Sequence, residues 1–402
     1  MGREFVVIGA GQAGQALVAK LRATDPDCAI TLVGDEPAPP YQRPPLSKKY
    51  LLGELAPERL YLRPEAWYGD QHATLRLGAP VTAIDRAAQT VTVGGEVLRY
   101  DGLALTTGSV PRQLPAAIGG ALDGVYTVRT LADVDAMAAE FRPGRRLLVV
   151  GGGYIGLEAA AVAARRGLKV TLVEAAPRIL QRVAAPETSA YFRAAHGGEG
   201  VEIREGTGLA RLLGETRVTG AELADGSTLD ADFVVVGVGI APDTRLAEAA
   251  GLAIDNGIAT DAHCRTSDPH IWAAGDCAAF PYRGARLRLE SVGNAIDMGE
   301  CAALNMAGQP GEYIPAPWFW SDQYDIKLQI AGLSSGYDRI VTRSGDNGVS
   351  HWYYAGDKLI AVDAMNDSRA YMVGKRLIES GRSPDPAVIA DPAADLKPLL
   401  KG

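Results

Sequence analysis

The fold is decided by the stretch Leu147-Leu148-Val149-Val150-Gly151-Gly152-Gly153-Tyr154-Ile155-Gly156-Leu157-Glu158, which is followed by Val170-Thr171-Leu172-Val173-Glu174. An apolar run of strand length meets three glycines, and an alanine-rich stretch that favours a helix comes next. A second apolar run then ends on a carboxylate about 20 residues after the last glycine of the turn. This order predicts a βαβ unit that binds a dinucleotide.

Each glycine of this turn has a separate physical task. Gly151 permits the tight turn, Gly153 lets the backbone approach a pyrophosphate, and Gly156 lets the helix pack closely on the strand. The helix that starts here offers free N–H groups and about half a positive charge at its N-terminus. A phosphate can therefore bind without a lysine.

The same arrangement opens the chain, with an apolar run at residues 5–8, the glycines Gly9, Gly11 and Gly14, and a second apolar run at residues 30–33. Asp35 and Glu36 follow that run, in the place that Glu174 holds in the other copy. A single glycine pattern is weak, because glycine turns are common in chains that bind no nucleotide. Two complete copies indicate that the chain binds two dinucleotides.

Composition limits the class of protein. The 402 residues suffice for two or three domains, and a net charge of −8 gives the chain no overall attraction for nucleic acid or anionic lipid. The N-terminus runs directly into the first strand, and no apolar stretch is long enough to span a membrane, so we expect a cytoplasmic protein. The four cysteines have neither C-x-x-C nor zinc spacing, which predicts reduced, buried thiols and no metal site.

The order of the segments predicts an α/β fold with two Rossmann-like domains. Residues 1–112 and 241–315 form the first domain, residues 113–240 form the second as an insertion, and residues 316–402 form a C-terminal α+β domain. In that last domain we expect a half-buried strand at 326–330, a hairpin around 355–357 and a helix over 367–380.

Several further positions are candidates for contact with a cofactor. Thr107 and Gly108 end an apolar strand, and Gly239 breaks the corresponding strand of the second domain. Asp276 follows another strand end, where ligands bind in open α/β sheets, although an N-cap for a following helix is equally compatible with that position. The proline-rich loop at 37–50 carries Arg43 and Lys48, which either hold phosphate or are solvated, and Ser47 is expected to cap a helix.

Taken together, these motifs resemble the FAD-dependent NADH:ferredoxin reductase family, flavoproteins with two dinucleotide-binding domains and a glutathione-reductase-like fold. The resemblance covers essentially the whole chain, including residues 43–48, 107–108, 266–276 and 290–292. Its most specific part is Pro317-Trp318-Phe319-Trp320-Ser321-Asp322-Gln323-Tyr324.

The resemblance implies FAD on the first domain and NADH on the second, and it assigns residues to each cofactor. On the FAD side it implies Gly9, Gly11, Ala13 and Gly14 at the pyrophosphate, Asp35 or Glu36 at the adenosine ribose, and further contacts from Arg43, Lys48, Val81, Thr107, Gly108, Arg129, Asp276 and Val292. On the NADH side it implies Gly151, Gly153, Ile155, Gly156, Gly239, Glu174 on the ribose 2′-hydroxyl, and Arg182 near the adenosine half. A carboxylate at Glu174 opposes the 2′-phosphate of NADPH, whereas Arg178 would tolerate it.

Four residues are implied at the reacting rings. Lys48 and Glu158 would form a pair beside the flavin, and Tyr154 would cover the ring and move aside for nicotinamide. Trp320 would lie near the flavin on the docking face, with a tryptophan of the domain core as the alternative. For Tyr154 the alternative is a tyrosine that only packs its helix.

The implied reaction passes a hydride from NADH to FAD and then single electrons to a 2Fe-2S ferredoxin that supplies a haem monooxygenase. The reductase of a ring-hydroxylating dioxygenase and a rubredoxin reductase are chemically equivalent alternatives, and an FAD- and NAD-binding redox sensor is a remote one. A disulfide reductase is disfavoured, because no cysteine lies between Cys28 and Cys264. Ferredoxin would dock transiently on a monomer or weak dimer, on arginines 283, 286 and 288 or on Lys327, Arg339, Lys375 and Arg376.

Overall fold

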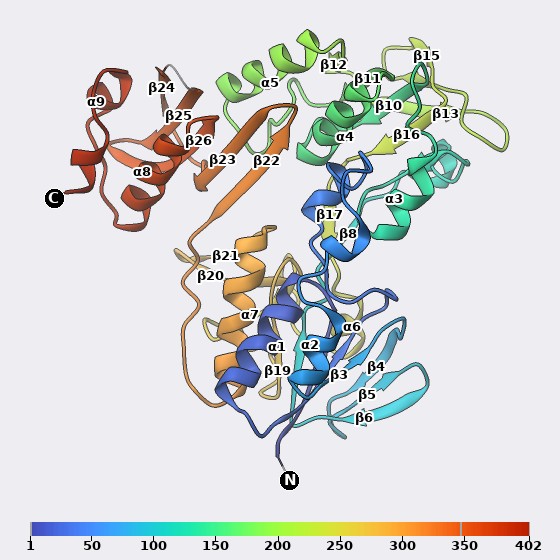
Figure 1. Ribbon diagram of the computed structural model, residues 1–402, viewed down its shortest axis with the longest axis vertical. Helices are drawn as coiled ribbons and strands as arrows, with labels where there is room; N and C mark the ends of the chain where they lie inside the picture. The colour runs from blue at the N-terminus through green and yellow to red at the C-terminus, as the bar shows by residue number, and fades with distance from the viewer. Residues whose placement is uncertain (1, 346–347, 402) are drawn as a thin grey trace. The chain divides into compact units, whose positions relative to one another are not determined.

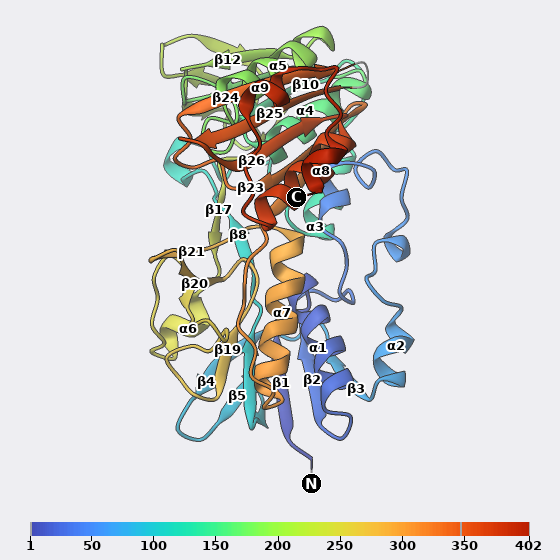
Figure 2. The same cartoon turned by 90° about the vertical axis from the view of Figure 1, so that its left-hand side faces the viewer.

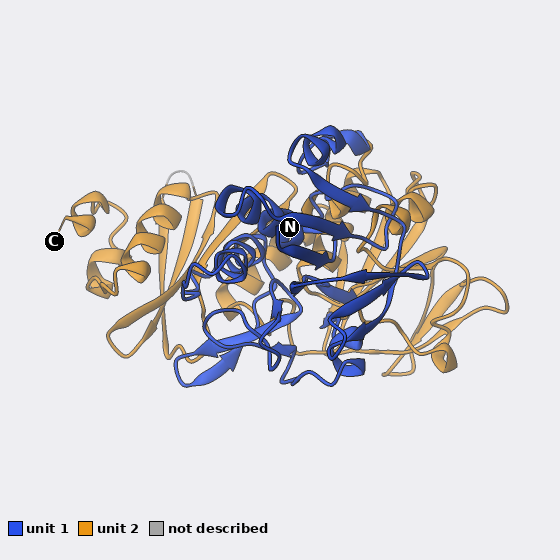
Figure 3. Ribbon diagram, turned by 90° about the horizontal axis from the view of Figure 1, so that it is seen from below, with its two compact units in different colours: residues 1–43, 56–110, 240–317 blue, residues 44–55, 111–239, 318–402 orange. Residues whose placement is uncertain are grey.

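The computed structural model describes residues 2–345 and 348–401. The chain divides into two compact units, which Figure 3 colours separately. The first unit comprises residues 1–43, 56–110 and 240–317, and the second comprises residues 44–55, 111–239 and 318–402. The second unit thus contains most of the expected inserted domain together with the C-terminal segment; the division into three domains stays a prediction.

The first unit is built on a parallel sheet of five strands in the order β19-β7-β1-β2-β3, of which Figure 2 labels β19, β1, β2 and β3. Its elements are β1 (Glu4–Ile8), α1 (Gln12–Thr24), β2 (Ala29–Val33), β3 (Ala73–Arg76), β7 (Gly102–Leu105), β19 (Ile271–Ala273) and α7 (Val292–Met306). Helices α1 and α7 pack together. A Cβ atom on Gly299 of α7 would lie 2.7 Å from the carbonyl oxygen of Ala13, so the approach of the two helices requires a glycine there.

Smaller elements complete the first unit. One antiparallel sheet consists of β4 (Val81–Asp85), β5 (Thr90–Val93) and β6 (Glu96–Arg99). A mixed sheet consists of β18 (Ile258–Ala259), β20 (Ala278–Tyr282) and β21 (Ala285–Leu287), in which β18 and β20 run parallel and β20 and β21 run antiparallel. The remaining elements are η2 (Pro57–Arg59), α2 (Glu65–Asp70), α6 (Arg245–Ala249), and the paired strands β8 (Ser109–Pro111) and β17 (Ile240–Pro242), where the chain passes from one unit to the other.

The second unit repeats the parallel sheet, in the order β12-β11-β10-β16-β9. Its elements are β9 (Val125–Tyr126), β10 (Arg146–Val150), α4 (Tyr154–Arg165), β11 (Lys169–Glu174), α5 (Pro186–Gly198), β12 (Glu202–Glu205) and β16 (Phe233–Val236). In both sheets the strand before the glycine turn lies in the centre, paired in parallel with the next strand along the chain; β11 ends on Glu174, whereas Asp35 lies two residues beyond the end of β2. The predicted duplication and the α/β fold class are confirmed.

The remaining elements of this part of the second unit are short. They are η1 (Pro44–Ser47), η3 (Ala116–Ile118), α3 (Leu131–Ala138), and the antiparallel strands β13 (Leu209–Leu213), β14 (Gly220–Leu223) and β15 (Thr228–Asp230). Thr130 and Asp133 cap α3 reciprocally, each side chain accepting a hydrogen bond from the backbone of the other.

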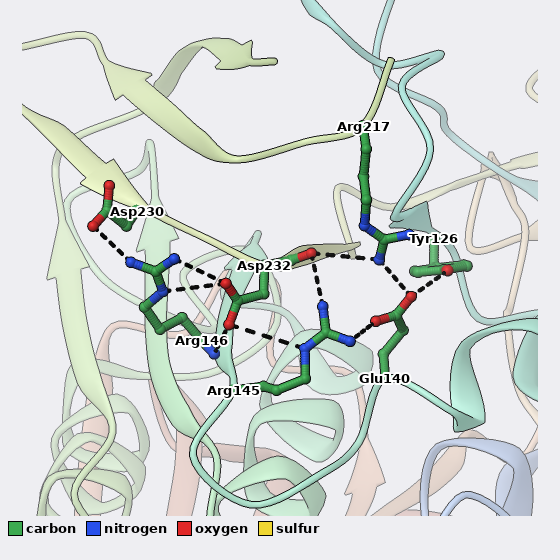
Figure 4. A network of polar contacts seen from close by, with 7 residues as sticks. All are labelled: Tyr126, Glu140, Arg145, Arg146, Arg217, Asp230 and Asp232. Atoms are coloured by element: carbon green, nitrogen blue, oxygen red, sulfur yellow. Dashed lines mark hydrogen bonds and ion pairs between the residues drawn. The ribbon is translucent and has the colours of Figure 1, made fainter. Parts of the chain in front are cut away.

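Arg145 and Arg146, at the start of strand β10, form ion pairs with acidic residues of neighbouring segments (Figure 4). Arg145 pairs with Glu140, and Arg146 pairs with Asp232 at 2.9 Å. Glu140 also accepts hydrogen bonds from Arg217 at 2.5 Å and from Tyr126 at 3.0 Å. Burial raises the pKa of Glu140, but the hydrogen bonds from Arg217 and Tyr126 and the charge of Arg145 outweigh it, so the net pKa lies below the ordinary value. The carboxylate therefore remains charged and holds these arginines.

The C-terminal segment forms an antiparallel sheet in the order β22-β23-β26-β25-β24 (Figure 1). Its elements are β22 (Trp318–Gln323), β23 (Ile326–Gly332), β24 (Arg339–Gly345), β25 (Gly348–Ala355), β26 (Lys358–Met365), α8 (Ser368–Glu379), α9 (Pro386–Ala390) and η4 (Lys397–Leu400). Helix α8 packs on the sheet and is capped by Asp367, whose side chain accepts from the N–H of Ala370. The predicted strand, hairpin and helix of this region are confirmed.

One local prediction is wrong, and the alternative considered for Asp276 is excluded. Ser47 does not cap a helix: it is the last residue of η1, residues 48–53 form turns, and its buried hydroxyl donates to Glu158 instead. Pro44 and Pro45, with φ fixed near the helical value, start that turn before Ser47. Asp276 does not cap a helix either, because strand β20 follows it. Its carboxylate accepts a hydrogen bond from Ser109 at 3.0 Å.

Candidate functional site

The first glycine turn, between β1 and α1, has little room for side chains at two of its three glycines. A Cβ atom on Gly9 would lie 2.2 Å from the carbonyl oxygen of Thr106, and Gly9 has φ +112°. A Cβ atom on Gly14 would lie 2.1 Å from the carbonyl oxygen of Gly9. At Gly11, in contrast, an added Cβ would meet no described atom within 4 Å. The protein itself therefore requires the first and third glycines, and the second faces open space.

The second glycine turn, between β10 and α4, repeats this geometry. A Cβ atom on Gly151 would lie 2.5 Å from the carbonyl oxygen of Gly237, and one on Gly156 would lie 2.1 Å from that of Gly151. At Gly153 the nearest described atom would be 4.0 Å away. At Gly11 and Gly153 the described protein atoms therefore leave room for a side chain, yet the sequence has glycine at both positions. A pyrophosphate bound close to the backbone would explain this choice.

The two helix ends also suit an anion. Gly11 and Gly153 are the N-cap residues, and the described structure shows no side-chain cap on either helix. Neither first turn, as far as it is described, contains an acidic residue. The backbone N–H groups and the positive end of each helix dipole are thus available to bind phosphate. FAD and nicotinamide dinucleotides each contain a pyrophosphate that could bind at such a helix end.

The acids that follow the second strands differ between the two copies. In the first unit Asp35 is exposed, whereas Glu36 is engaged by Arg43 at 2.7 Å and by the hydroxyl of Tyr41 at 2.6 Å. In the second unit Glu174 accepts from the N–H of Gly152 at 2.7 Å and from that of Ala176 at 2.8 Å. Glu174 is therefore fixed against the glycine turn, as a residue that recognises the ribose would need to be.

Arg178, the residue expected to tolerate a 2′-phosphate, has a partner of its own. Its guanidinium donates to the hydroxyl of Ser189 at 2.6 Å, and Ser189 in turn donates to the carbonyl of Ile179 at 2.7 Å. The sequence carries no local signal for this arrangement, because Ser189 lies on the next helix. Arg182, the other candidate on this side, is exposed.

Several predicted FAD contacts lie on different elements of the first unit. Thr107 donates to the carbonyl of Asp243 at 2.6 Å, and Gly108 follows it with φ +70°. Val292 is the first residue of α7, whose N-cap Ser291 accepts from the N–H of Asn294. Val81 opens β4 and is half-buried, and Ala13 is buried on α1.

Glu158 is the centre of a buried cluster in the second unit. Its side chain is 2% exposed, and its Oε2 atom accepts from Lys48 at 2.7 Å and from Ser47 at 2.5 Å. Its Oε1 atom accepts from Ser321 at 2.6 Å. The expected pair of Lys48 and Glu158 is thus formed, with two serine hydroxyls that sequence reasoning missed. The only feature of the sequence that pointed to Ser47 and Ser321 was that each lies in a segment that carries the family resemblance, residues 43–48 and 317–324.

Several aromatic residues are close in the sequence to members of this cluster: Tyr154 precedes Glu158, and Phe319 and Trp320 precede Ser321. Tyr154 opens α4, and its ring lies 4.8 Å from that of Phe319 at an angle of 36°. Its hydroxyl is buried and finds no hydrogen-bond partner among the described residues, and burial raises its pKa well above the ordinary value. Trp320 is half-buried and stacks on Trp318, with ring centroids 5.5 Å apart.

The remaining candidates occupy separate positions. Gly239 has φ +98° and accepts from the N–H of Arg112 at 2.9 Å, Arg129 is half-buried just before α3, and Ile155 is 41% exposed on α4. Their roles, like those of all the candidate site residues, stay predictions.

All four cysteines are buried free thiols. In residues 2–345 and 348–401, no group of three or more His, Cys, Asp and Glu side chains is placed to hold a metal ion. None of the helices in the described part of the chain combines the length and the apolar character needed to cross a membrane.

Comparison with known proteins agrees with this geometry. Residues 3–299 match the model of the pyridine nucleotide-disulphide oxidoreductases, and residues 318–400 match that of the reductase C-terminal domain. The chain belongs to the pyridine nucleotide-disulphide oxidoreductase family. The resemblance found in the sequence is thereby confirmed, and the chain is an oxidoreductase that uses FAD and NAD(H).

Within this family the chain is similar over its whole length to ferredoxin reductases. It is 42% identical to rhodocoxin reductase of Rhodococcus erythropolis over 98% of this chain and 93% of the relative. It is 40% identical to the ferredoxin–NAD(+) reductase component of the anthranilate 1,2-dioxygenase system of Burkholderia cepacia, over 98% and 99%. The solved covalent complex of putidaredoxin reductase and putidaredoxin matches with a TM-score of 0.95 and 40% identity, over 99% of this chain and 98% of that one.

Proposed function

We propose that this protein is an NADH-dependent ferredoxin reductase that passes electrons from NADH, through FAD, to a 2Fe-2S ferredoxin supplying a haem monooxygenase. The observation that carries the proposal is the pair of glycine turns at uncapped helix ends, each with one glycine at which an added Cβ atom would meet no described atom closer than 4.0 Å. The full-length similarity to ferredoxin reductases supports the choice of acceptor.

The chain's own residues contribute binding and orientation. In the proposal, α1 and Asp35 bind one nucleotide, whereas α4 and Glu174 bind the other. When bound, FAD supplies the chemistry, because it accepts two electrons as a hydride and releases them singly to an iron–sulfur protein. Lys48 and Glu158 provide a fixed charge pair that orients the reacting rings, and neither needs to exchange a proton.

Glu174 is the proposed basis for a preference for NADH. Its carboxylate is held by two backbone N–H groups, so it cannot move away from a 2′-phosphate without losing both hydrogen bonds. Arg178, which would neutralise that phosphate, is engaged by Ser189. Both contacts support discrimination against NADPH.

A reductase of a ring-hydroxylating dioxygenase is the second candidate. It is favoured by a specific observation: the relative from the anthranilate 1,2-dioxygenase system is nearly as similar as rhodocoxin reductase. Ferredoxin would dock over a small interface and leave quickly, and we expect the enzyme to work in the cytoplasm as a monomer or weak dimer.

The test uses purified protein loaded with FAD. NADH should bleach the flavin, and addition of a 2Fe-2S ferredoxin and cytochrome c should give sustained cytochrome reduction that depends on the ferredoxin. A redox sensor would bind NADH without sustained cytochrome reduction, and that outcome would overturn the proposal. Parallel assays with rubredoxin and with ferredoxins of monooxygenase and dioxygenase systems separate the remaining candidates.

A further inference from the structure

A chain of hydrogen bonds leads from Glu158 away from Lys48, within the second unit. Ser321 Oγ lies 2.6 Å from Glu158 Oε1, and Gln323 Nε2 lies 3.1 Å from Ser321 Oγ. His196 Nε2 lies 2.8 Å from Gln323 Oε1, and the Tyr324 hydroxyl lies 2.9 Å from His196 Nδ1. Three side chains and four hydrogen bonds thus connect Glu158 on α4 to Tyr324 beyond the end of β22.

Four of the five residues that these hydrogen bonds connect are buried, and Tyr324 is half-buried. Ser321 and His196 are 0% exposed, Gln323 is 1% exposed and Glu158 is 2% exposed. Polar groups at such depth are costly unless each is hydrogen-bonded, and a satisfied network rigidifies its surroundings. The residues that form these hydrogen bonds come from separate elements, since His196 lies on α5 whereas Ser321 and Gln323 lie on β22.

The direction of every hydrogen bond follows from Glu158. An ionised carboxylate only accepts, so Ser321 must donate to it. Ser321 Oγ then accepts from the amide N–H of Gln323, whose carbonyl oxygen accepts from His196 Nε2–H. A neutral ring with its proton on Nε2 has a free lone pair on Nδ1, which accepts from the Tyr324 hydroxyl. All four donors point toward Glu158, and bonds aligned in this way strengthen one another.

The titration of the two outer members is consistent with this direction. Burial lowers the pKa of His196, which keeps the imidazole neutral, with one N–H. Burial raises the pKa of Tyr324, so the phenol keeps the proton that it donates.

The backbone at Tyr324 adds an independent observation. Tyr324 lies in the turn between β22 and β23 with φ +58°, a conformation that costs energy for a residue with a side chain. Its ring packs edge-on against His196, with centroids 5.0 Å apart. A strained residue persists where its surroundings fix it, and here the contact with His196 does so.

We propose that Tyr324, His196, Gln323 and Ser321 are positioning residues that hold the Glu158 carboxylate in a fixed orientation toward Lys48. This inference rests on the proposed function, in which Glu158 and Lys48 orient the reacting rings. Without Ser321, the Oε1 atom loses its donor and the carboxylate can turn away from Lys48. Hydride transfer would then slow, whereas NADH binding through the glycine turn and Glu174 would not change.

The first test concerns the hydrogen-bond chain alone and needs no turnover. Nitrogen NMR of the protein labelled at histidine, with His196→Gln used to assign the signal, reports the tautomer of His196. The expected result at pH 7.5 is a neutral ring protonated at Nε2. A ring protonated at Nδ1, or at both nitrogens, would overturn the proposed direction.

The second test compares variants by rapid mixing with NADH. Ser321→Ala and His196→Leu should slow flavin reduction about tenfold without raising the NADH dissociation constant. His196→Gln should restore the rate to within about twofold, because a glutamine donates and accepts at the same two places. The matched control is Ser350→Ala, a serine that is also 0% exposed but lies on β25 outside the hydrogen-bond chain.

The outcomes separate the inference from the function on which it rests. Equal rates in wild type, Ser321→Ala and His196→Leu would overturn the positioning role, as would equal slowing in His196→Leu and His196→Gln. If His196→Leu does not fold, Ser321→Ala decides the kinetic question, because it removes a single oxygen atom. If NADH fails to bleach the wild-type flavin, the proposed function fails, and the His196 tautomer still decides the hydrogen-bond chain.

Discussion

Ser321 donates a 2.6 Å hydrogen bond to Glu158, although 163 positions separate the two residues in the sequence. The sheet of the C-terminal segment thereby contributes to the same carboxylate that Lys48 and Ser47 reach from η1 and the turn after it. With one ammonium and two hydroxyl donors, this buried charge is compensated. The position of the Glu158 carboxylate depends on each of these donors, so the contribution of each can be tested by substituting one donor at a time.

Lys48→Met should both destabilise the protein and slow its reaction. The substitution leaves the Glu158 carboxylate 2% exposed without a cation, and breaking such a buried pair typically costs about 3–5 kcal/mol of unfolding free energy. The loss of the charge pair should also slow flavin reduction by NADH by about tenfold or more. Denaturant unfolding and rapid mixing measure the two effects.

Lys49→Met is the matched control for this substitution. Lys49 is the next residue and is exposed, so its loss should change neither unfolding nor flavin reduction. Equal behaviour of the two methionine variants would show that Lys48 has no special role.

Gly153→Ala should fold normally and lose affinity for NADH. The added Cβ atom would lie 4.0 Å from the nearest described atom, so the fold can accept it, whereas a pyrophosphate at the helix end could not. We expect an unchanged melting temperature and a dissociation constant for NADH raised by about tenfold or more. Titration calorimetry with the reduced or oxidised nucleotide measures the change.

Gly151→Ala, in contrast to Gly153→Ala, should destabilise the fold. Its Cβ atom would lie 2.5 Å from the carbonyl oxygen of Gly237 at φ +106°, so this variant should lose stability even without nucleotide. A Gly153→Ala variant that melts like Gly151→Ala, or that binds NADH like wild type, would contradict the assignment of the second glycine to the pyrophosphate.

Glu174→Gln should weaken the preference for NADH over NADPH. The amide removes the negative charge while keeping one acceptor for the backbone N–H groups of Gly152 and Ala176. The ratio of kcat/KM values for the two nucleotides should fall by about tenfold or more, mainly because NADPH binds better. Glu202→Gln, on the exposed face of the neighbouring strand β12, should leave the ratio unchanged. An unchanged ratio in Glu174→Gln would show that another residue discriminates.

The fold could be predicted because its signals are local. Each glycine turn, with its apolar strand before and its acid after, lies within about 30 residues, the length of a βαβ unit. The hairpin at Gly356 and Asp357 and the helix ended by Gly381 are likewise local, and both are confirmed. Ser47 was assigned wrongly because a serine after prolines suits a helix cap, and no local signal showed that its hydroxyl is used by Glu158.

The site could be predicted only in part, because its partners come from distant segments. The pair of Lys48 and Glu158 followed from the family resemblance, but the donor Ser321 and the chain through Gln323 and His196 did not. Those contacts depend on how β22 packs against α4 and places Gln323 beside His196 of α5, which no pattern of spacing encodes. A histidine in the last turn of a helix gives no sign that its ring is 0% exposed.

A second buried histidine makes the stability of the protein depend on pH. His351 is 3% exposed, its Nδ1 atom lies 2.7 Å from Thr188 Oγ1, and Thr188 donates to Asp363 at 2.8 Å. Burial lowers the pKa of His351 to about 4. The unfolded chain binds a proton near the ordinary pKa of about 6.5, so this stability is fully present above that pH and is lost as the pH falls toward 4.

Asp363 acts in the opposite direction, because burial raises its pKa to about 6 and folding is then favoured by protonation at low pH. A comparison with His351→Gln isolates the histidine, since a glutamine can still donate to Thr188 while Asp363 titrates in both proteins. Between pH 7.5 and pH 5, wild type should lose about 2 kcal/mol more unfolding free energy than His351→Gln. Urea unfolding at the two pH values measures this difference. Equal losses would mean that His351 is protonated in the folded state as readily as in the unfolded chain.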